Sequence, residues 1–388
     1  MAQWFATSLG FAFGALAVCG CGYYVLCLWS VRAFRRECPA REVAAFTPPV
    51  SILKPLRGAD PHMLECFQSH CRQDYPEYEI IFGVSESDDP AIALVQELKR
   101  EFPERRIELV HCSERLGTNL KVSNLVQMLP HARFDHLVVN DSDIRVGQEY
   151  LRNIMAPFSD ASTGMVTTPY RGVPGATFGS KLEALGISTD FIPGVLAARV
   201  VDGGIHFGLG STLAIKRASL DAIGGFEPLL DYLADDFELG KRIADAGYKV
   251  VLSHEVVDTY LPDYRFGEYW KHQQRWMRSI RDSRGAGYAG LIFTFGLPFA
   301  LAALLVSGGA AWSWAVAGCA LLLRFCAAYS VAVQYLRDSK IVSYFWMIPL
   351  RDVLVVTLWI TGYFKNSVTW RGDEFTLKDG KLARQAEP

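Results

Sequence analysis

The chain has 388 residues, of which 50% are hydrophobic, so it is long enough for one large domain with membrane segments. Its formal net charge of −2 lacks the basic surplus that binds nucleic acid, and we expect no nucleic-acid partner. Nine cysteines occur without a C-x-x-C pair or His/Cys ligand spacing, which excludes the common zinc motifs and favours a compartment without disulfides.

An apolar stretch without charged residues covers residues 9–31, which is long enough to cross a bilayer. It is too long for the core of a signal peptide and has no basic region before it, so residues 1–36 are predicted to be an N-terminal membrane anchor. Basic residues follow at once. They are Arg32, Arg35, Arg36 and Arg41. Because basic flanks stay in the cytoplasm, we expect the large domain behind them to lie there too.

After a linker that closes at Pro48-Pro49, short apolar runs alternate with helical patterns up to about residue 261, as in βαβ units. The strand candidates are residues 50–53, 78–84, 107–110, 137–140 and 165–168. Asp60-Pro61 and Asp89-Pro90 indicate an N-cap and a first-turn proline at two helix starts. The sequence therefore predicts an α/β domain over residues 48–265 with a doubly wound, mostly parallel sheet.

Residues 268–284 carry aromatic and basic side chains at helical spacing next to the membrane region. We expect this helix to lie in the membrane interface, within an amphipathic segment over residues 266–288. Two apolar stretches follow, residues 291–306 and 312–336, and Ser307-Gly308-Gly309 separates them. The pattern predicts a helical hairpin in a membrane region that covers residues 289–364.

Residues 343–364 could form one more span, but Arg351 and Asp352 interrupt them, and such charges are costly in lipid. A full crossing would also place Lys365 and Arg371 outside the cytoplasm, against the distribution of basic residues. We favour a re-entrant or surface-lying segment here, followed by a tail over residues 365–388.

Two carboxylates, Asp141 and Asp143, follow the apolar run at residues 137–140. If that run is a buried strand, they lie at its carboxyl end, where open α/β sheets bind ligands. Two hard oxygen ligands there suit Mg²⁺ or Mn²⁺ holding a diphosphate, although a solvated turn would also explain them.

Two further acidic pairs follow strands or begin helices. Asp88 and Asp89 lie just past the second strand, where they could cap a helix or accept hydrogen bonds from a nucleoside. Asp235 and Asp236 begin a helix, where they could favour the helix dipole. The alternative is that Asp236 acts as a general base that deprotonates an acceptor hydroxyl.

The helix next to the membrane contains His272-Gln273-Gln274-Arg275-Trp276. Basic and aromatic helices often bind anionic headgroups. Alternatively, Arg275 balances the charge of a leaving diphosphate and Trp276 packs on the acceptor.

In order and spacing, these motifs resemble the inverting glycosyltransferases of family two and the closely related ceramide glucosyltransferases of family twenty-one. That family has a GT-A-type fold with three spaced aspartate motifs and a Q/R-x-x-R-W motif. The resemblance runs from Val50 to Arg281. The matching stretches are Val50-Ser51-Ile52-Leu53-Lys54-Pro55-Leu56-Arg57-Gly58, Asp74-Tyr75-Pro76, Asp88-Asp89-Pro90-Ala91, Leu116-Gly117-x-Asn119-x-Lys121-Val122-x-Asn124-Leu125 and Asp141-Ser142-x-Ile144-Arg145.

The likeness implies that Asp88 and Asp89 contact the nucleotide, that Asp141 serves the metal and that Asp236 is the base. The chain departs from the family at His272, where Gln or Arg is usual, and the family varies at the position of Asp143. Lys54 and Lys121 are candidates for phosphate binding, although either could be a surface lysine.

Several stretches are more similar to a bacterial branch, the hopanoid-biosynthesis-associated glycosyltransferases. They are Phe67-x-x-x-Cys71-Arg72-Gln73-Asp74-Tyr75-Pro76, Lys121-Val122-Ser123-Asn124-Leu125, Tyr170-Arg171-Gly172-Val173-Pro174, Leu185-Gly186-Ile187-Ser188-Thr189-Asp190-Phe191 and Tyr232-Leu233-Ala234-Asp235-Asp236. The likeness implies transfer of N-acetylglucosamine from UDP to bacteriohopanetetrol. Asp190, His272 and Asp235 are candidates for contacts with donor or acceptor.

The sequence thus predicts a multi-pass enzyme of the bacterial inner membrane, with a UDP-sugar donor, a lipid acceptor and a divalent cation. A ceramide glucosyltransferase that uses UDP-glucose shares every motif. A processive polysaccharide synthase would need more spans, and a non-enzymatic scaffold would not need Asp141, Asp236 and Arg275.

Overall fold

A computed structural model describes residues 2–37, 46–370 and 373–384, so Arg41 and Arg371 lie outside the described residues. The chain divides into two compact units. The helical unit comprises Met1–Glu37, Ala176–Val201 and Asp263–Asp379. The sheet unit comprises Cys38–Gly175, Asp202–Pro262 and Gly380–Pro388. This division differs from the expected 48–265 domain in that residues 176–201 group with the apolar helices.

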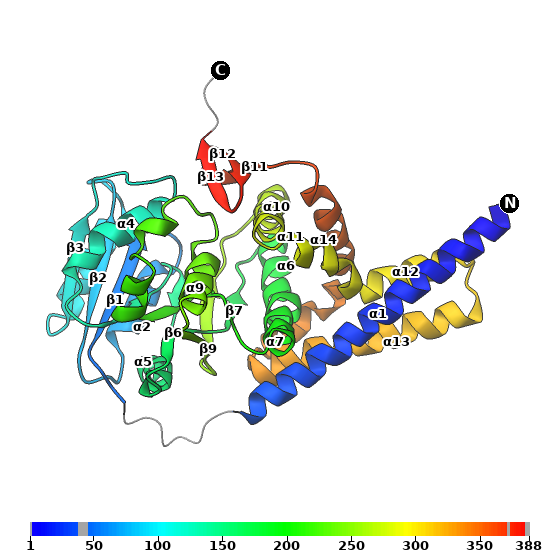
Figure 1. The fold of residues 1–388 in the computed structure, drawn as a ribbon, viewed down its shortest axis with the longest axis horizontal. Coiled ribbons are helices and arrows are strands. Elements are labelled where there is room, and N and C mark those ends of the chain that lie inside the picture. The colour runs from blue at the N-terminus through cyan, green and yellow to red at the C-terminus, as the bar shows by residue number, and fades with distance from the viewer. Residues whose placement is uncertain (1, 38–45, 371–372, 385–388) are drawn as a thin grey trace. The chain divides into compact units, whose positions relative to one another are not determined.

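The sheet unit contains a seven-stranded sheet in the order β3-β2-β1-β4-β8-β6-β9 (Figure 1). Its strands are β1 Val50–Leu56, β2 Tyr78–Val84, β3 Arg106–His111, β4 His136–Val139, β6 Thr163–Thr167, β8 Leu213–Lys216 and β9 Lys249–Leu252. Strands β1 to β4 are parallel, β9 is parallel to β6, and β8 runs antiparallel to both β4 and β6. The predicted mostly parallel α/β sheet is confirmed, and all five strand candidates are strands.

A second, smaller sheet in this unit has the order β5-β10-β7. Its strands are β5 Ile144–Arg145, β7 Tyr170–Val173 and β10 Val257–Tyr260. The helices of the unit are α2 Met63–Cys71, α3 Ala91–Glu101, α4 Leu120–Met128, α5 Tyr150–Met155, α8 Arg217–Ala222 and α9 Asp235–Asp245. Strand β13, Lys381–Arg384, also belongs to this unit.

Two helix starts differ from their predictions. Asp60 was expected to cap α2, but the N-cap is His62, whose φ of 64° is left-handed. The reason is a turn before the helix, in which the Met63 N–H donates to the Asp60 carbonyl at 3.3 Å. At α3 the N-cap is Pro90, one residue after the predicted Asp89, and the Asp89 carboxylate accepts a hydrogen bond from the Ala91 N–H at 2.8 Å.

The α-helices of the helical unit differ in length and polarity. They are α1 Ala2–Arg36, α6 Phe178–Gly186 with α7 Ile192–Val201, α10 Phe266–Ser283, α11 Gly285–Gly290, α12 Gly296–Val306, α13 Ala311–Tyr329 and α14 Ile348–Gly362. Strands β11 Ser367–Trp370 and β12 Asp373–Lys378 pair antiparallel. Four described helices are long and apolar enough to cross a membrane, or up to five if a bent pair is counted as one span.

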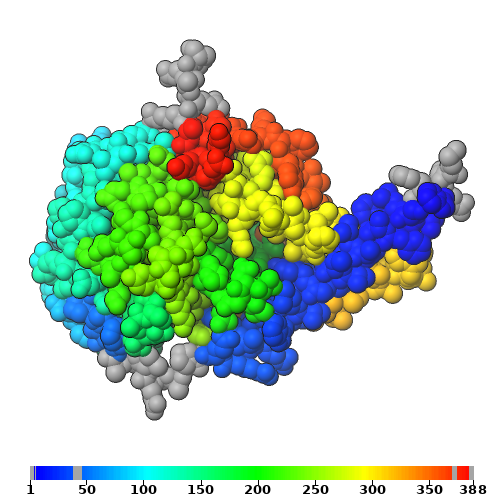
Figure 2. All heavy atoms as spheres, viewed as in Figure 1, coloured from blue at the N-terminus to red at the C-terminus, as the bar shows by residue number. Residues whose placement is uncertain are grey.

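Helix α1 packs along α12 and α13 and leaves one side uncovered, as Figure 2 shows for the blue helix. Trp4, Phe11, Val18 and Val25 lie on this side, since they are spaced by seven residues and are between 51% and 76% exposed. A continuous stripe of exposed large apolar side chains is unusual in water and matches a surface that faces lipid.

The first member of the predicted membrane hairpin is broken. Residues Gly285–Thr294 and Gly296–Val306 are bent by 53° relative to each other. Pro298 disfavours helical geometry in the residue before it and has no N–H for the preceding turn. At the same place, a Cβ on Gly20 of α1 would overlap the backbone of Gly296, so the two helices approach closely.

Residues 343–364, for which we expected a re-entrant or surface-lying course, belong to one of the four candidate spans, Lys340–Gly362. The two charges that argued against a span pair with other helices rather than with each other. Arg351 Nη1 donates to Asp190 Oδ2 at 3.1 Å. Asp352 accepts two hydrogen bonds of 2.9 Å from Arg324. Pairing reduces the cost of burying such charges in an apolar unit.

Candidate active site

The carboxyl end of β4 is fixed by a buried asparagine. Asn140 Nδ2 donates to the Tyr150 hydroxyl at 2.9 Å, to the Ser211 carbonyl at 2.7 Å and to Thr212 Oγ1 at 3.1 Å. These bonds join the strand end to the loop before β8. Asp141 therefore follows the carboxyl end of β4 from a defined position, which is the place predicted for it from the sequence.

Lys121 of α4 lies between two carboxylates of the sheet unit. Its Nζ is 2.9 Å from Asp141 Oδ1 and 3.3 Å from Asp235 Oδ2. Burial by itself would lower the pKa of Lys121, but the neighbouring Asp141, Asp235 and Asp236 outweigh it and raise the pKa above its ordinary value. Lys121 is thus a fixed cation among three acids and not a surface lysine.

Asp236 and Asp141 approach the same point from different elements. A Cβ built on Gly210 would lie 3.1 Å from Asp236 Oδ2 and 3.4 Å from Asp141 Oδ2. Only a residue without a side chain leaves this space open between the two carboxylates. The Phe237 N–H donates to Asp236 Oδ1 at 2.8 Å, which leaves Oδ2 on the side of Gly210.

The pKa of Asp236 is raised to about 6, first by burial and then by the charge of Asp235, while Lys121 acts in the opposite direction. A carboxylate with a pKa near neutrality is a better proton acceptor than an ordinary aspartate. Asp235, in contrast, is engaged by Lys121 and by Asn119 Nδ2, which lies 3.3 Å from Asp235 Oδ1. The two adjacent acids therefore have different environments.

Asp143 lies beside the small sheet. Its Oδ2 accepts a hydrogen bond from Thr259 Oγ1 at 2.9 Å. Burial, followed by the charge of Asp141, raises the pKa of Asp143 to about 7. A bound cation would relieve this repulsion between the two carboxylates.

Lys54 of β1 is completely buried, and its Nζ donates to the Asp141 carbonyl at 3.1 Å. Burial lowers the pKa of Lys54 to about 8. Its hydrogen bond fixes the backbone of Asp141, so Lys54 is a positioning residue in this structure, whereas a direct phosphate contact stays a prediction.

The two acids after β2 differ as well. The carboxylate of Asp89 accepts hydrogen bonds from the Gly58 N–H at 2.9 Å and from the Ala91 N–H at 2.8 Å, so it links the loop after β1 to the start of α3. Asp88 is exposed beside it. A nucleotide contact stays a prediction for both, and the geometry favours Asp88.

Asn119 is a site residue whose role the sequence did not reveal. It caps α4 through the Val122 N–H at 3.2 Å, and its Nδ2 donates to the Tyr232 carbonyl at 2.8 Å. An asparagine before a helix can be recognised in a sequence as an N-cap. Its hydrogen-bond partners, over a hundred residues away, cannot be recognised in the same way. The cap positions Lys121 in the first turn of α4.

Residues at the end of the chain contact the segment that leads into α9. The Leu382 N–H donates to the Asp231 carbonyl at 2.7 Å, and the Leu233 N–H donates to the Gly380 carbonyl at 3.0 Å. The Lys381 ammonium lies 5.4 Å from the centre of the Tyr232 ring. The loop that precedes Asp236 is therefore held by Asn119 and by residues 380–382.

The remaining predicted site residues lie in the helical unit. Asp190 pairs with Arg351, and the Trp276 ring lies 5.7 Å from the Phe191 ring. His272 Nδ1 is 3.1 Å from Glu183 Oε1, without the geometry of a hydrogen bond. Arg275 is on the same helix, α10, one turn after His272 and Lys271. The predicted site residues therefore divide between the two units. The helical unit contains Asp190, His272, Arg275 and Trp276, and the sheet unit contains the other acids and the two lysines.

The side chains at this end of the sheet give partial support to the binding of a divalent cation. In the described part of the chain, no three His, Cys, Asp or Glu side chains form a preformed metal cluster. Asp141 and Asp143 nevertheless supply two carboxylates at one strand end. This fits Mg²⁺ or Mn²⁺ sites in which one or two carboxylates, waters and substrate phosphates complete the coordination shell.

Known proteins share this fold. The chain resembles a mannosyltransferase from Pyrobaculum calidifontis solved in complex with GDP-Man and Mn²⁺, with a TM-score of 0.56 and 18% identity over 94% of this chain and 99% of that one. At this identity the likeness concerns the fold, which confirms the predicted GT-A-like architecture.

Curated proteins match by sequence as well. Ceramide glucosyltransferase 3 of Caenorhabditis elegans is 30% identical over 209 residues, which are 53% of this chain and 45% of the relative. Beta-monoglucosyldiacylglycerol synthase of Synechocystis is 22% identical over 205 residues, which are 52% of this chain and 42% of the relative. The matches thus span less than half of each relative. The profile of glycosyl transferase family 21 matches residues 12–383, nearly the whole chain, and the chain therefore belongs to glycosyl transferase family 21.

Proposed function

We propose that this chain is a membrane-bound inverting glycosyltransferase that moves N-acetylglucosamine from its UDP-sugar to a hydroxyl of bacteriohopanetetrol. The observation that carries the enzymatic part is the approach of Asp141 and Asp236 to one point beside Gly210, with Lys121 as the nearby cation. Family membership and the candidate membrane spans support a sugar transfer to a lipid.

The donor diphosphate would bind at the carboxyl end of β4. Asp141, assisted by Asp143, would hold a divalent cation, which when bound would neutralise charge on the diphosphate. Lys121 places a permanent positive charge next to Asp141 and supports the same task. Asp88 is the candidate contact to uracil or ribose, because Asp89 is engaged by backbone N–H groups.

Asp236 would accept the proton of the acceptor hydroxyl while the hydroxyl oxygen attacks the anomeric carbon. The new C–O bond forms as the bond to the diphosphate breaks, and UDP leaves with the electron pair. One such displacement inverts the anomeric configuration. The motif assigns Arg275 to the leaving diphosphate and Trp276 to the acceptor, and both roles stay predictions.

The choice of hopanoid rests on sequence motifs, above all the stretch from Leu185 to Phe191 that contains Asp190. The acceptor is the finer part of the proposal, because the relative from Caenorhabditis elegans is a ceramide glucosyltransferase. That relative favours a second candidate function, glucosyl transfer from UDP-glucose to ceramide. Both reactions would use the same acids and the same lysine.

The proposed location is the bacterial inner membrane, with the sheet unit in the cytoplasm. The support is the cluster of arginines at the end of α1, since basic residues beside a span favour the cytoplasmic side. UDP-sugars would reach the sheet unit from the cytoplasm, and the lipid acceptor would reach it from the bilayer.

The test crosses two donors with two acceptors. Membranes that contain the chain receive UDP-N-acetylglucosamine or UDP-glucose together with bacteriohopanetetrol or ceramide, and mass spectrometry identifies the lipid products. Membranes with the Asp236→Asn variant are the control for other transferases. An N-acetylhexosaminyl hopanoid supports the proposal. A hexosylceramide instead overturns the proposed substrates, and no product with any pair overturns the activity.

A further inference from the structure

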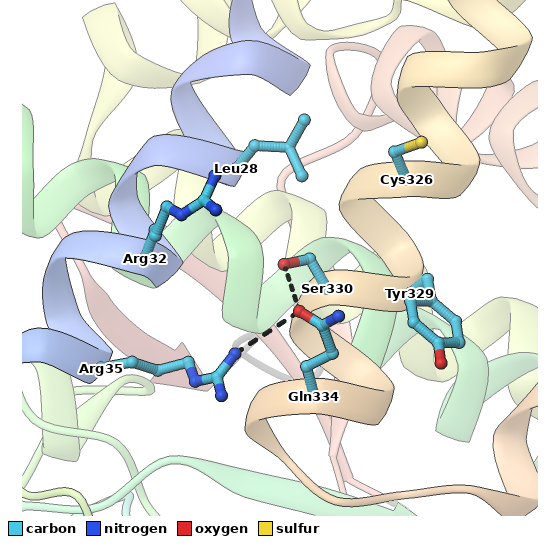
Figure 3. Close-up of a pocket in the computed structure, with 7 residues that line it drawn as sticks. All are labelled: Leu28, Arg32, Arg35, Cys326, Tyr329, Ser330 and Gln334. Atoms are coloured by element: carbon cyan, nitrogen blue, oxygen red, sulfur yellow. Dashed lines mark hydrogen bonds between the residues drawn. The ribbon is translucent and has the colours of Figure 1, made fainter.

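A pocket of about 390 Å³ lies in the helical unit between α1 and the end of α13 (Figure 3). At Ser330 the helix α13 changes into a π-helical turn, Ser330–Tyr335. The residues that line the pocket are Leu28, Arg32, Arg35, Cys326, Tyr329, Ser330 and Gln334. The centres of the Phe34 ring on α1 and the Tyr335 ring at the end of the π-helical turn are 5.6 Å apart. The end of α1 and the end of this turn therefore lie beside each other.

The polar part of the pocket is cationic. Arg35 Nη1 donates to Gln334 Oε1 at 3.4 Å, and Ser330 Oγ donates to the same oxygen at 3.3 Å. In the described ranges no carboxylate pairs with Arg32 or Arg35. Glu37, a carboxylate nearby in the sequence, is paired with Arg199. The two guanidinium groups therefore have donors to offer to an anion, and Ser330 and Gln334 add neutral hydrogen-bonding groups.

The other part of the pocket is apolar and continues along the helices. Leu28 and Cys326 lie one turn before the polar residues, as Figure 3 shows. Val25 of α1 and Leu322 of α13 are exposed apolar residues in the middle part of their candidate spans. Exposed Trp29 and Tyr329 lie at the height where aromatic residues mark the boundary between lipid and water.

From this arrangement we infer that the pocket binds the phosphate group of an anionic phospholipid such as phosphatidylglycerol. Arginine is suited to phosphate because its planar N–H groups form paired, charge-assisted hydrogen bonds. Free phosphate has the same chemistry but no use for the apolar half of the pocket. One acyl chain of a phospholipid would cover Leu28 and Cys326 and continue along the apolar surface beyond them.

The experiment uses the purified full chain in detergent with an equimolar mixture of phosphatidylglycerol and phosphatidylcholine, and native mass spectrometry counts the retained lipids. We expect one phosphatidylglycerol to be retained preferentially. Arg32→Gln and Arg35→Gln should each reduce this preference by about tenfold. Arg36→Gln is the matched control, because Arg36 is the neighbouring exposed arginine of α1 and does not line the pocket.

A second variant tests the pocket without changing its charge. Cys326→Phe fills the apolar half and should displace the lipid while Arg32 and Arg35 remain. The inference is overturned if Arg36→Gln lowers the preference as much as Arg32→Gln, because binding would then follow overall charge. It is also overturned if inorganic phosphate displaces the lipid at low concentration, since the site would then be one for free phosphate. Equal retention of both lipids overturns it as well.

Discussion

The Lys121 ammonium lies 2.9 Å from the Asp141 carboxylate, although the lysine is in the first turn of α4 and the aspartate follows β4. This pair joins the helix that Asn119 caps to the sheet edge that Asn140 fixes. It provides the site with a permanent positive charge at the place where a diphosphate is expected.

Removal of the Lys121 charge should therefore impair transfer. In Lys121→Gln we expect kcat/KM to fall by about a hundredfold, because a preorganised charge close to the leaving group is lost. Lys121→Arg keeps the charge and should retain much more activity than Lys121→Gln. Steady-state kinetics with purified chain in detergent compares the two. Equal loss in both variants would mean that the shape of lysine matters and not its charge.

Asp236→Asn should lower kcat by about a thousandfold, in the range expected for loss of a general base, while UDP binding stays close to normal. Asp245→Asn is the matched control, since Asp245 ends the same helix, α9, and its side chain is 68% exposed. Transfer rates and calorimetric UDP titrations separate the two effects. Activity near normal in Asp236→Asn would refute the assignment of the base.

The pH profile of kcat/KM should have an acidic limb near the pKa of Asp236 in the free enzyme, about 6. A base is active only when deprotonated, so the rate should rise with pH through this value and level off above it. Initial rates at subsaturating substrate concentrations give kcat/KM, whose pH dependence reports the free enzyme. A rate that falls as pH rises through the same range would show that the group must be protonated and would contradict the base role.

Gly210→Ala should reduce transfer strongly with little change in stability. The new Cβ would lie 3.1 Å from Asp236 Oδ2 and 3.4 Å from Asp141 Oδ2, in the space between the two carboxylates. Gly204→Ala in the same loop is the control, because the nearest atom to its Cβ is 3.7 Å away on the His206 ring. Activity and thermal unfolding are measured on both variants. Full activity in Gly210→Ala would show that no reactant needs this space.

Arg324→Met should destabilise the helical unit by about 3–5 kcal/mol, because Asp352 would remain buried without its partner. The double variant Arg324→Met/Asp352→Leu should recover most of the loss, since apolar side chains can replace a buried ion pair. Thermal unfolding in detergent compares the two variants with the parent chain. If the double variant is no more stable than the single one, the cost does not come from an unpaired charge.

Much of the sheet unit could be predicted because its strands are short apolar runs bounded by turn residues. The acids could be predicted as well, since each follows a strand or begins a helix. Strand β8 was not foreseen, because a run of four residues at Leu213–Lys216 gives little periodicity. Its antiparallel direction depends on pairing with β4 and β6 and not on local sequence.

The span Phe178–Val201 was missed for a different physical reason. It contains four charged residues, Lys181, Glu183, Asp190 and Arg199. Because of these charges, the segment does not stand out as apolar when the sequence alone is examined. Arg351, far away in the sequence, pairs with Asp190 and packs against Gly186 of the same span. Partners so distant are visible only in three dimensions, and the same is true of Lys121 and Asp141.

The contact between residues 380–382 and the loop before α9 has a consequence for biogenesis. The ribosome makes these residues after Asp263–Asp379, the last and largest segment of the helical unit. During synthesis, the loop that carries Tyr232 and leads to Asp236 therefore lacks two of its backbone hydrogen bonds until the membrane helices have been made. Asp236, the proposed base, is therefore preceded by a loop that gains these two hydrogen bonds only after Asp263–Asp379 has been synthesised.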